Sequence, residues 1–173
     1  NTLDAFNVPS AGGTAFFIDS TPATASFNET TPIYISSSTP TIALSGQVSD
    51  GSSGVGYIDL IWQSTSGGAI ASQSVPIMVS SPSPWSYTWN ASSLAAGKYN
   101  LWVVAADQAK PNPNVESYTS KTPRTVIVDR DGPVVNRVSL GNMAIDINAM
   151  AQPVVIASAV TRLTAVVSDT GNS

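Results

Sequence analysis

The sequence predicts an all-β fold, and three observations carry this prediction. Apolar and polar residues alternate with a period of two in several short segments, most clearly at Trp85, Tyr87 and Trp89, which is typical of a half-buried strand. Residues that favour turns separate these segments, as in Ser49 to Gly54. No segment carries the apolar stripe of an amphipathic helix; residues 142–150 are the only stretch that could hold a short helix.

The expected strands are short, and most of them end at Pro, Gly or Asp. In chain order they are 14–18, 23–27, 33–35, 41–48, 55–62, 69–79, 85–89, 99–105 and 116–128. The two strands at 85–89 and 99–105 hold three of the four Trp residues. We expect this pair to anchor a hydrophobic core, because large aromatic side chains dominate the energetics of burial.

The same aromatic residues allow a second interpretation. Trp85, Tyr87, Trp89 and Trp102 could form a flat platform on which a sugar stacks. Aromatic side chains at alternating positions more often pack in the core and across strands, and we expect that here. Trp102 decides between the two, because it is out of phase with its neighbour Leu101. An exposed Trp102 would favour glycan binding.

The chain repeats itself. Residues Ile18 to Pro22 return in similar form as Val128 to Pro133, and the motif Val48-Ser49-Asp50 returns as Val167-Ser168-Asp169. A repeat of about a hundred residues with six or seven short strands predicts an immunoglobulin-like β-sandwich with Greek-key connections. We therefore expect a closing strand of a preceding unit in residues 1–20, one complete sandwich of about seven strands in 21–131, and the opening strands of a following unit in 132–173.

Composition excludes several classes of function. Only 10% of the 173 residues are charged, against about 25% in ordinary soluble domains, which fits an extracellular, stalk-like protein. The net charge of −4 predicts no nucleic-acid partner. No apolar run approaches the ~20 residues of a membrane span, so we expect no membrane insertion. The chain has no His and no Cys, which removes the usual general base and the thiol nucleophile, so we expect no enzyme.

With these residues placed, the chain resembles the tandem bacterial immunoglobulin-like (Big-type) domains of prokaryotic surface and secreted proteins. The matching segments are Ile18 to Pro22, Ser38 to Pro40, Gly46 to Asp50, Pro84 to Trp89, Gly97 to Leu101 and Ala105 to Ala109. The last segment departs from the family pattern, because Lys110-Pro111-Asn112 stands where the family has Gly-Asn. The resemblance covers the central unit and part of each flank, and it implies a fold more specifically than a function.

Calcium is the cofactor that the acidic residues suggest. In an immunoglobulin-like topology Asp19, Asp50 and Asp107 would lie at one pole, where three carboxylates offer the hard oxygen ligands that Ca²⁺ prefers. The second junction repeats part of this set. The candidate ligands are therefore Asp19, Asp50, Asp107, Asp129, Asp131 and Asp169. The alternative is that each Asp caps a turn by accepting hydrogen bonds from nearby backbone N–H groups.

Two asparagines have the pattern of a glycosylation acceptor. They are Asn28, in Asn28-Glu29-Thr30, and Asn90, in Asn90-Ala91-Ser92. In a chain rich in Asn, Ser and Thr the same pattern also arises by chance.

These observations together predict an extracellular structural module in a tandem array on a prokaryotic surface, such as a stalk, an S-layer or a filament. Its partners would be neighbouring immunoglobulin-like units of the same or identical chains, and surface glycans are a further candidate partner. The alternative function is an adhesin or carbohydrate-binding accessory domain of a secreted protein. An exposed aromatic strip would favour the alternative.

Overall fold

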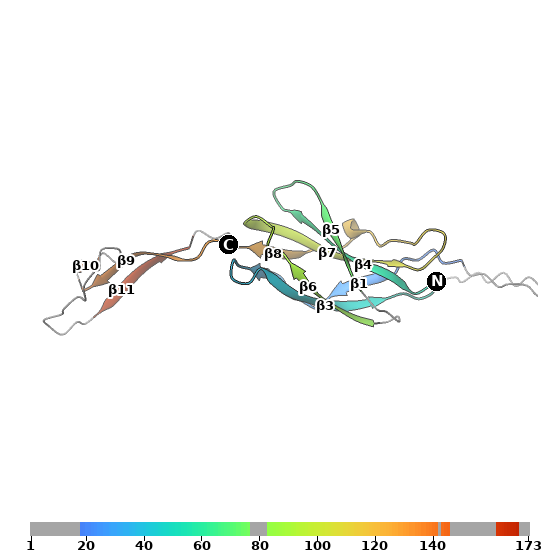
Figure 1. The fold of residues 1–173 in the computed structure, drawn as a ribbon, viewed down its shortest axis with the longest axis horizontal. Helices are drawn as coiled ribbons and strands as arrows, with labels where there is room; N and C mark the ends of the chain where they lie inside the picture. Colours follow the sequence, from blue (N-terminus) through green and yellow to red (C-terminus); the bar gives the residue numbers. More distant parts are fainter. Residues whose placement is uncertain (1–17, 77–82, 142, 146–161, 170–173) are drawn as a thin grey trace, which may run out of the picture.

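A computed structural model of the chain describes residues 18–76, 83–141, 143–145 and 162–169 (Figure 1). The predicted all-β class is confirmed: the described strands form three sheets. The described part of the chain contains no α-helix, only the short 3₁₀ turn η1 (Tyr118–Ser120). Strand β10 (Met143–Ile145) lies within the stretch that could have held a helix, and residues 142 and 146–150 lie outside the described residues.

The first sheet has three strands in the order β1-β3-β6. They are β1 (Thr24–Phe27), β3 (Thr41–Ser49) and β6 (Ser83–Asn90). Trp85 of β6 lies opposite Gly46 of β3, and its indole Nε1 donates a hydrogen bond to the carbonyl oxygen of Ser26 at 3.1 Å. A Cβ at Gly46 would collide with that same oxygen, so this position requires glycine.

The second sheet has five strands in the order β2-β8-β7-β4-β5. They are β2 (Ile33–Ile35), β8 (Arg124–Val128), β7 (Gly97–Asp107), β4 (Val55–Ser64) and β5 (Ala71–Val75). Strand β2 pairs with β8 in parallel and the other pairs are antiparallel. Because β1 and β2 follow each other in the chain but belong to different sheets, the N-terminal segment joins both sheets.

One hydrophobic core takes residues from both sheets. Alternating side chains of β3 and β6 are buried in it, including Leu44, Trp85 and Trp89. Between the sheets, the rings of Trp62 on β4 and Trp89 on β6 have centroids 5.4 Å apart. The core interpretation of Trp85 and Trp89 is therefore confirmed.

Strand β7 is buried on both faces from Leu101 onward, which the period of two did not predict. The connection before β8 covers its outer face. Trp102 packs edge-on against Tyr118 of η1, with ring centroids 5.3 Å apart, and its Nε1 donates to the carbonyl oxygen of Lys121 at 3.3 Å. The expected strand 116–128 is accordingly shorter than predicted: β8 begins at Arg124, because residues before it cross over Trp102.

Two other expected strands differ from the structure or fall partly outside it. The strand expected at 69–79 is present as β5 (Ala71–Val75), and residues 77–79 lie outside the described residues. In the strand expected at 14–18, only Ile18 is described, and it is not in a strand.

The third sheet, β10-β9-β11, extends away from the two larger sheets, beyond the end of β8 (Figure 1). It is formed by β9 (Val134–Leu140), β10 and β11 (Leu163–Ser168). Its central pair repeats the pair β1–β3. Thr24 lies five residues after Asp19 and pairs with Ser49; Val134 lies five residues after Asp129 and pairs with Ser168. The sequence repeat is therefore also a repeat of strand register over the first two residue pairs, before the β-bulge between Val166 and Val167.

The chain enters and leaves the two-sheet body at opposite poles. At the end of β7, Asp107 pairs with Val55, which follows the loop after β3. At the start of β7, Gly97 pairs with Val128, the last residue of β8. The eleven residues of β7 span roughly 33 Å at the usual rise of a strand. The body therefore places its entry and exit segments about the length of β7 apart.

Candidate metal centre

Three carboxylates meet at the entry pole. Asp19 precedes β1, Asp50 follows β3 and Asp107 ends β7, and one carboxylate oxygen of each lies within 4.8 Å of the others. The pairing of Thr24 with Ser49 brings the first two together. The antiparallel pairing of β7 with β4 brings the third beside the loop that begins at Asp50.

Asp107 is the most buried of the three, with 1% of its surface exposed, and it is the only buried charged side chain among the described residues. N–H groups of the following loop surround it. Its Oδ1 accepts from the backbone N–H groups of Ala109 at 3.0 Å and Asn114 at 2.8 Å, and its Oδ2 accepts from Asn114 Nδ2 at 2.6 Å. Asn114 Nδ2 also donates to the carbonyl oxygen of Asp19 at 2.9 Å, which ties the entry segment to this loop.

Asp50 organises the loop between β3 and β4. Its Oδ2 accepts from the N–H groups of Ser52 at 2.9 Å and Gly54 at 2.6 Å. Gly54 has a φ of +87°, a left-handed conformation that glycine adopts without steric cost. Its carbonyl oxygen accepts from the N–H of Gln108 at 2.9 Å, so the loops at Asp50 and Asp107 are bonded to each other.

Asp19 bonds to its own turn and to the neighbouring loop. Its Oδ1 accepts from the N–H of Thr21 at 3.0 Å and its Oδ2 from the N–H of Ser53 at 2.9 Å. The nearby Ser53 hydroxyl, followed by these N–H groups, lowers the pKa of the Asp19 carboxyl, against a small opposing effect of burial. The Ser53 Oγ is buried, yet it lacks a partner with good hydrogen-bond geometry, so the backbone bond is the firmer contact between Ser53 and Asp19.

The turn-capping interpretation is correct for each of these residues. Asp19, Asp50, Asp107 and Asp129 all accept a hydrogen bond from the N–H group two residues further on, the geometry of an Asx turn. Turn capping does not require the three carboxylates to lie close together, however, because each turn forms within its own loop. The clustering of three carboxylates is a separate feature of the entry pole.

The donor set fits a hard divalent cation. A carboxylate has about four lone-pair sites on its two oxygens, more than the N–H bonds named above for each of these residues, so the N–H bonds leave acceptor capacity for a metal. Ca²⁺ takes about six to eight oxygen ligands, and the cluster offers three carboxylates with the buried Ser53 Oγ, which lacks a partner, close to Asp19. The three residues could therefore hold a metal ion.

The second junction is less complete. Asp129 repeats the turn of Asp19, accepting from the N–H of Asp131 at 3.0 Å, and Asp169 follows β11 as Asp50 follows β3. Asp131 and Asp169 are exposed. Over the ranges that the structure describes, only Asp19, Asp50 and Asp107 form a group of three potential ligands. The other three candidates are not brought together.

Asn114 and Ser53 belong to this pole and were not predicted. Asn114 lies seven residues after Asp107 in a loop rich in Pro and Asn, and nothing in the sequence pattern distinguishes it from Asn112. Ser53 is one of several serines in its turn. Only the folded loops show which of these side chains face Asp19 and Asp107.

Both candidate glycosylation sites are accessible. Asn28 and Asn90 are exposed. Asn28 Nδ2 donates to Ser45 Oγ at 3.3 Å, and Asn90 Oδ1 accepts from the N–H of Ser92 at 2.9 Å. Neither contact blocks the side chain from solvent, so both remain candidates for which an intact mass would show any attached glycan.

The described residues contain no helix with the length and hydrophobicity that a membrane span requires. In comparisons with known proteins, no family model and no curated protein matches this chain.

Proposed function

We propose that residues 21–131 are an immunoglobulin-like Greek-key sandwich and that the chain is part of an extracellular tandem array on a prokaryotic cell surface, where it acts as a spacer. Several features support this. The strands form two facing sets, β1-β3-β6 and β2-β8-β7-β4-β5, around one core. The segment 24–35 contributes one strand to each set, β1 to the first and β2 to the second. In the array, neighbouring units would meet end to end.

The path of the chain is the observation that carries this proposal. It enters at the pole of Asp107 and leaves at the pole of Gly97. Directly beyond the exit, β9 and β11 begin pairing in the same register as β1 and β3. A unit with opposite entry and exit poles adds its own length to an array, roughly 33 Å along β7, and this is the geometry that a spacer needs.

We further propose that the Asp19–Asp50–Asp107 cluster binds calcium. These three residues come from the entry segment and from two loops of the sandwich, so an ion held by all three would fix the entry segment to the pole. Calcium would supply positive charge and coordination; the chain's own residues supply the position of each ligand through the Asx turns and through Asn114. The expected consequence is a stiffer junction.

The alternative of a carbohydrate-binding or adhesin domain has less support. Trp85, Trp89 and Trp102 are all buried, so these rings form no platform on which a sugar could stack. Tyr34 on β2 is exposed, and a single ring offers little compared with a strip. If the protein bound no sugar on a glycan array, this result would agree with the spacer function. The proposed spacer function is not an enzymatic one.

Small-angle X-ray scattering of the chain tests the spacer proposal. We expect an elongated particle in which β9–β11 projects from the two-sheet body. The distribution of its maximum dimensions should be narrower in about 1 mM Ca²⁺ than in a chelator, because extracellular modules bind Ca²⁺ with affinities of ~10⁻⁴–10⁻³ M. A compact particle, with the third sheet folded against the body, would contradict the proposal. Proteolytic release of the protein from intact source cells would test its surface location.

A further inference from the structure

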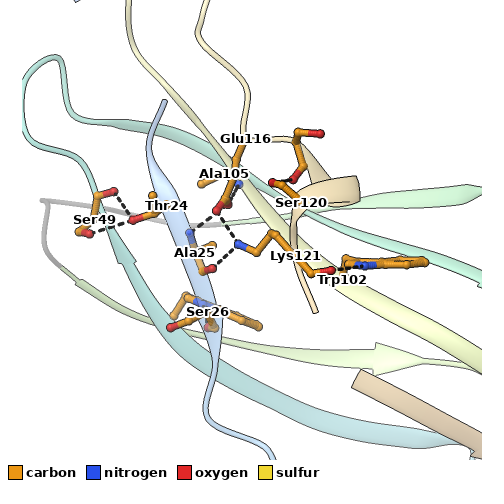
Figure 2. Close-up of polar contacts among 11 residues, drawn as sticks. Thr24, Ala25, Ser26, Ser49, Trp102, Ala105, Glu116, Ser120 and Lys121 are labelled. Atoms are coloured by element: carbon orange, nitrogen blue, oxygen red, sulfur yellow. Dashed lines mark hydrogen bonds and ion pairs between the residues drawn. The ribbon is translucent and has the colours of Figure 1, made fainter. Parts of the chain in front are cut away.

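The outer edge of β1 is closed by side chains rather than by another strand. In the order β1-β3-β6, β1 is an edge strand, and among the described strands it pairs with β3 alone, so its outer edge has no strand beside it there. The backbone groups of Ala25, in the middle of β1, bond instead to Glu116 and Lys121 from the connection between β7 and β8. Figure 2 shows both side chains reaching β1.

The contacts form a closed set. Glu116 Oε2 accepts from the N–H of Ala25 at 3.1 Å and from the N–H of Ala105 at 3.2 Å, so one carboxylate joins β1 of the first sheet to β7 of the second. Glu116 Oε1 accepts from Lys121 Nζ at 2.6 Å, and Lys121 Nζ also donates to the carbonyl oxygen of Ala25. Carboxylate and ammonium thus take the places of the C=O and N–H of an adjacent strand.

The carbonyl oxygen of Phe27, two residues after Ala25 on β1, is also bonded to a side chain of this region. Arg124 donates to the carbonyl oxygen of Phe27 at 3.4 Å. Beside these contacts lies a cavity of about 220 Å³, lined among others by Phe27, Trp102, Lys121 and Arg124. The cavity thus lies next to the β1 backbone groups whose hydrogen bonds Lys121 and Arg124 occupy.

The stability of the fold alone does not explain why a Glu116–Lys121 ion pair lies here. Both side chains are mostly buried, with 15% and 19% exposed, and desolvation offsets much of the attraction in such a pair. An unpaired edge strand, in contrast, invites pairing with another chain, and natural sheets block such edges with charged side chains. The pair satisfies a backbone that would otherwise accept a strand.

We propose that Glu116 and Lys121 form a latch that closes the β1 edge against strand addition, and that the edge without the latch pairs with β1 of a second copy. The two copies of β1 would lie antiparallel across a two-fold axis, because such an axis makes the same edge complementary to itself. Ala25 of each copy would then exchange N–H and C=O bonds with the other. This inference does not depend on the role of the chain in an array.

Sedimentation velocity over a concentration series tests the proposal with the double variant Glu116→Ala/Lys121→Ala. We expect its self-association constant to exceed that of the wild type by about tenfold or more, because two backbone hydrogen bonds become available to each pair of copies. The charge-matched control is Lys110→Ala/Asp131→Ala, in which both side chains are exposed. It should associate like the wild type.

A third substitution locates the contact. Adding Ala25→Pro to the double variant removes the N–H that a second copy would use, and proline is tolerated on an edge strand where that N–H faces outward. We expect the triple variant to return to the wild-type association constant. If the double variant associates no more than the wild type, or if Ala25→Pro leaves the gain intact, the latch does not close this edge.

Loss of the bond to Ala105 could unfold the double variant, which circular dichroism would reveal. In that case Lys121→Met decides, because it keeps the aliphatic stem and the Glu116 bond to Ala105 while opening the carbonyl oxygen of Ala25. It also removes the ammonium that holds Glu116, so a second copy has only the Glu116 carboxylate to displace from the Ala25 N–H. We expect a smaller gain in association that Ala25→Pro again abolishes. No gain in Lys121→Met would overturn the proposal.

Discussion

The strand pairs β1–β3 and β9–β11 begin in the same register, before a β-bulge in the second pair, and they lie in opposite environments. Ala25 pairs with Val48, and both are buried, with 6% and 1% exposed. Their counterparts Val135 and Val167 also pair, and are 41% and 54% exposed. Register is thus reproduced by the local sequence, from the Asp turn to the Val-Ser-Asp motif. Burial is not, because it requires a second sheet over the same face.

The uncovered pair already has the pattern of a core face. Paired residues point to the same side of a sheet and alternate residues to opposite sides. By this rule, and because the β-bulge between Val166 and Val167 shifts the phase of β9, the paired residues on one face of β9–β11 are all apolar, namely Val135, Val138, Leu140, Leu163, Ala165 and Val167. The opposite face carries Val166 together with polar residues such as Arg137, Ser139 and Thr164. The difference between the two pairs therefore lies in what covers them.

The largest difference should appear when a charge is placed at equivalent positions, two residues before Asp50 and Asp169. Val48→Asp buries an unpaired carboxylate in the core and should cost about 3–5 kcal/mol or more. Val167→Asp should change the same unfolding transition by less than about 0.5 kcal/mol. Urea unfolding followed by Trp fluorescence measures this, because all four Trp lie between residues 62 and 102. Equal losses in both variants would mean that β9–β11 folds as part of the two-sheet body.

A smaller contrast is expected from truncating leucines at equivalent positions, six residues before each aspartate. Leu44 is fully buried and Leu163 is 67% exposed. Leu44→Ala should cost about 2–5 kcal/mol through lost burial and the cavity left behind, while Leu163→Ala should stay within about 0.5 kcal/mol. The two midpoints in urea provide the comparison. A costly Leu163→Ala would show that another surface covers this residue in solution.

The smallest contrast concerns Asp19 and Asp129, which make the same turn. Because the pKa of Asp19 is lowered from 3.8 in the folded chain, protonation favours the unfolded chain. Its contribution to stability is present above pH 3.8 and is lost as the pH falls through the lowered value.

Unfolding free energies at pH 6 and pH 3, either side of the ordinary Asp pKa, test this. Asp19→Asn should cost about 1 kcal/mol or less at the higher pH, as expected for a lost cap, and should lose less stability on acidification than the wild type. Asp129→Asn is the control, because Asp129 makes the same turn at the other junction. If Asp19→Asn lost as much stability on acidification as the wild type, the Asp19 carboxylate would not contribute to the pH dependence of stability.

The sequence predicted much of the fold because its signals were local. Alternation at Trp85 to Trp89 placed a strand and its buried face correctly, and the repeated Asp and Val-Ser-Asp motifs predicted a second strand pair. The outer face of β7 was missed, because Trp102 is covered by residues more than ten positions further on. The alternation of residues within a strand cannot predict that a loop far along the chain will cover its outer face.

The candidate site was predictable in part for the same reason. Asp19, Asp50 and Asp107 each stand at the end of an apolar segment, so a sandwich topology brings their strand ends to one pole. Asn114 and Ser53 contact this pole through the conformation of irregular loops, which residue type and spacing do not determine. The latch at Glu116 was missed because the connection was expected to be a continuous strand.

The melting temperature with and without calcium tests whether the Asp19–Asp50–Asp107 cluster binds this ion. Trp fluorescence should show a higher melting temperature in Ca²⁺ than in a chelator, since a ligand at 100 times its Kd stabilises the folded state by about 2.7 kcal/mol. Asp50→Asn should abolish the shift and Asp129→Asn should retain it. No shift in the wild type, or an equal shift in Asp50→Asn, would show that the cluster does not bind calcium.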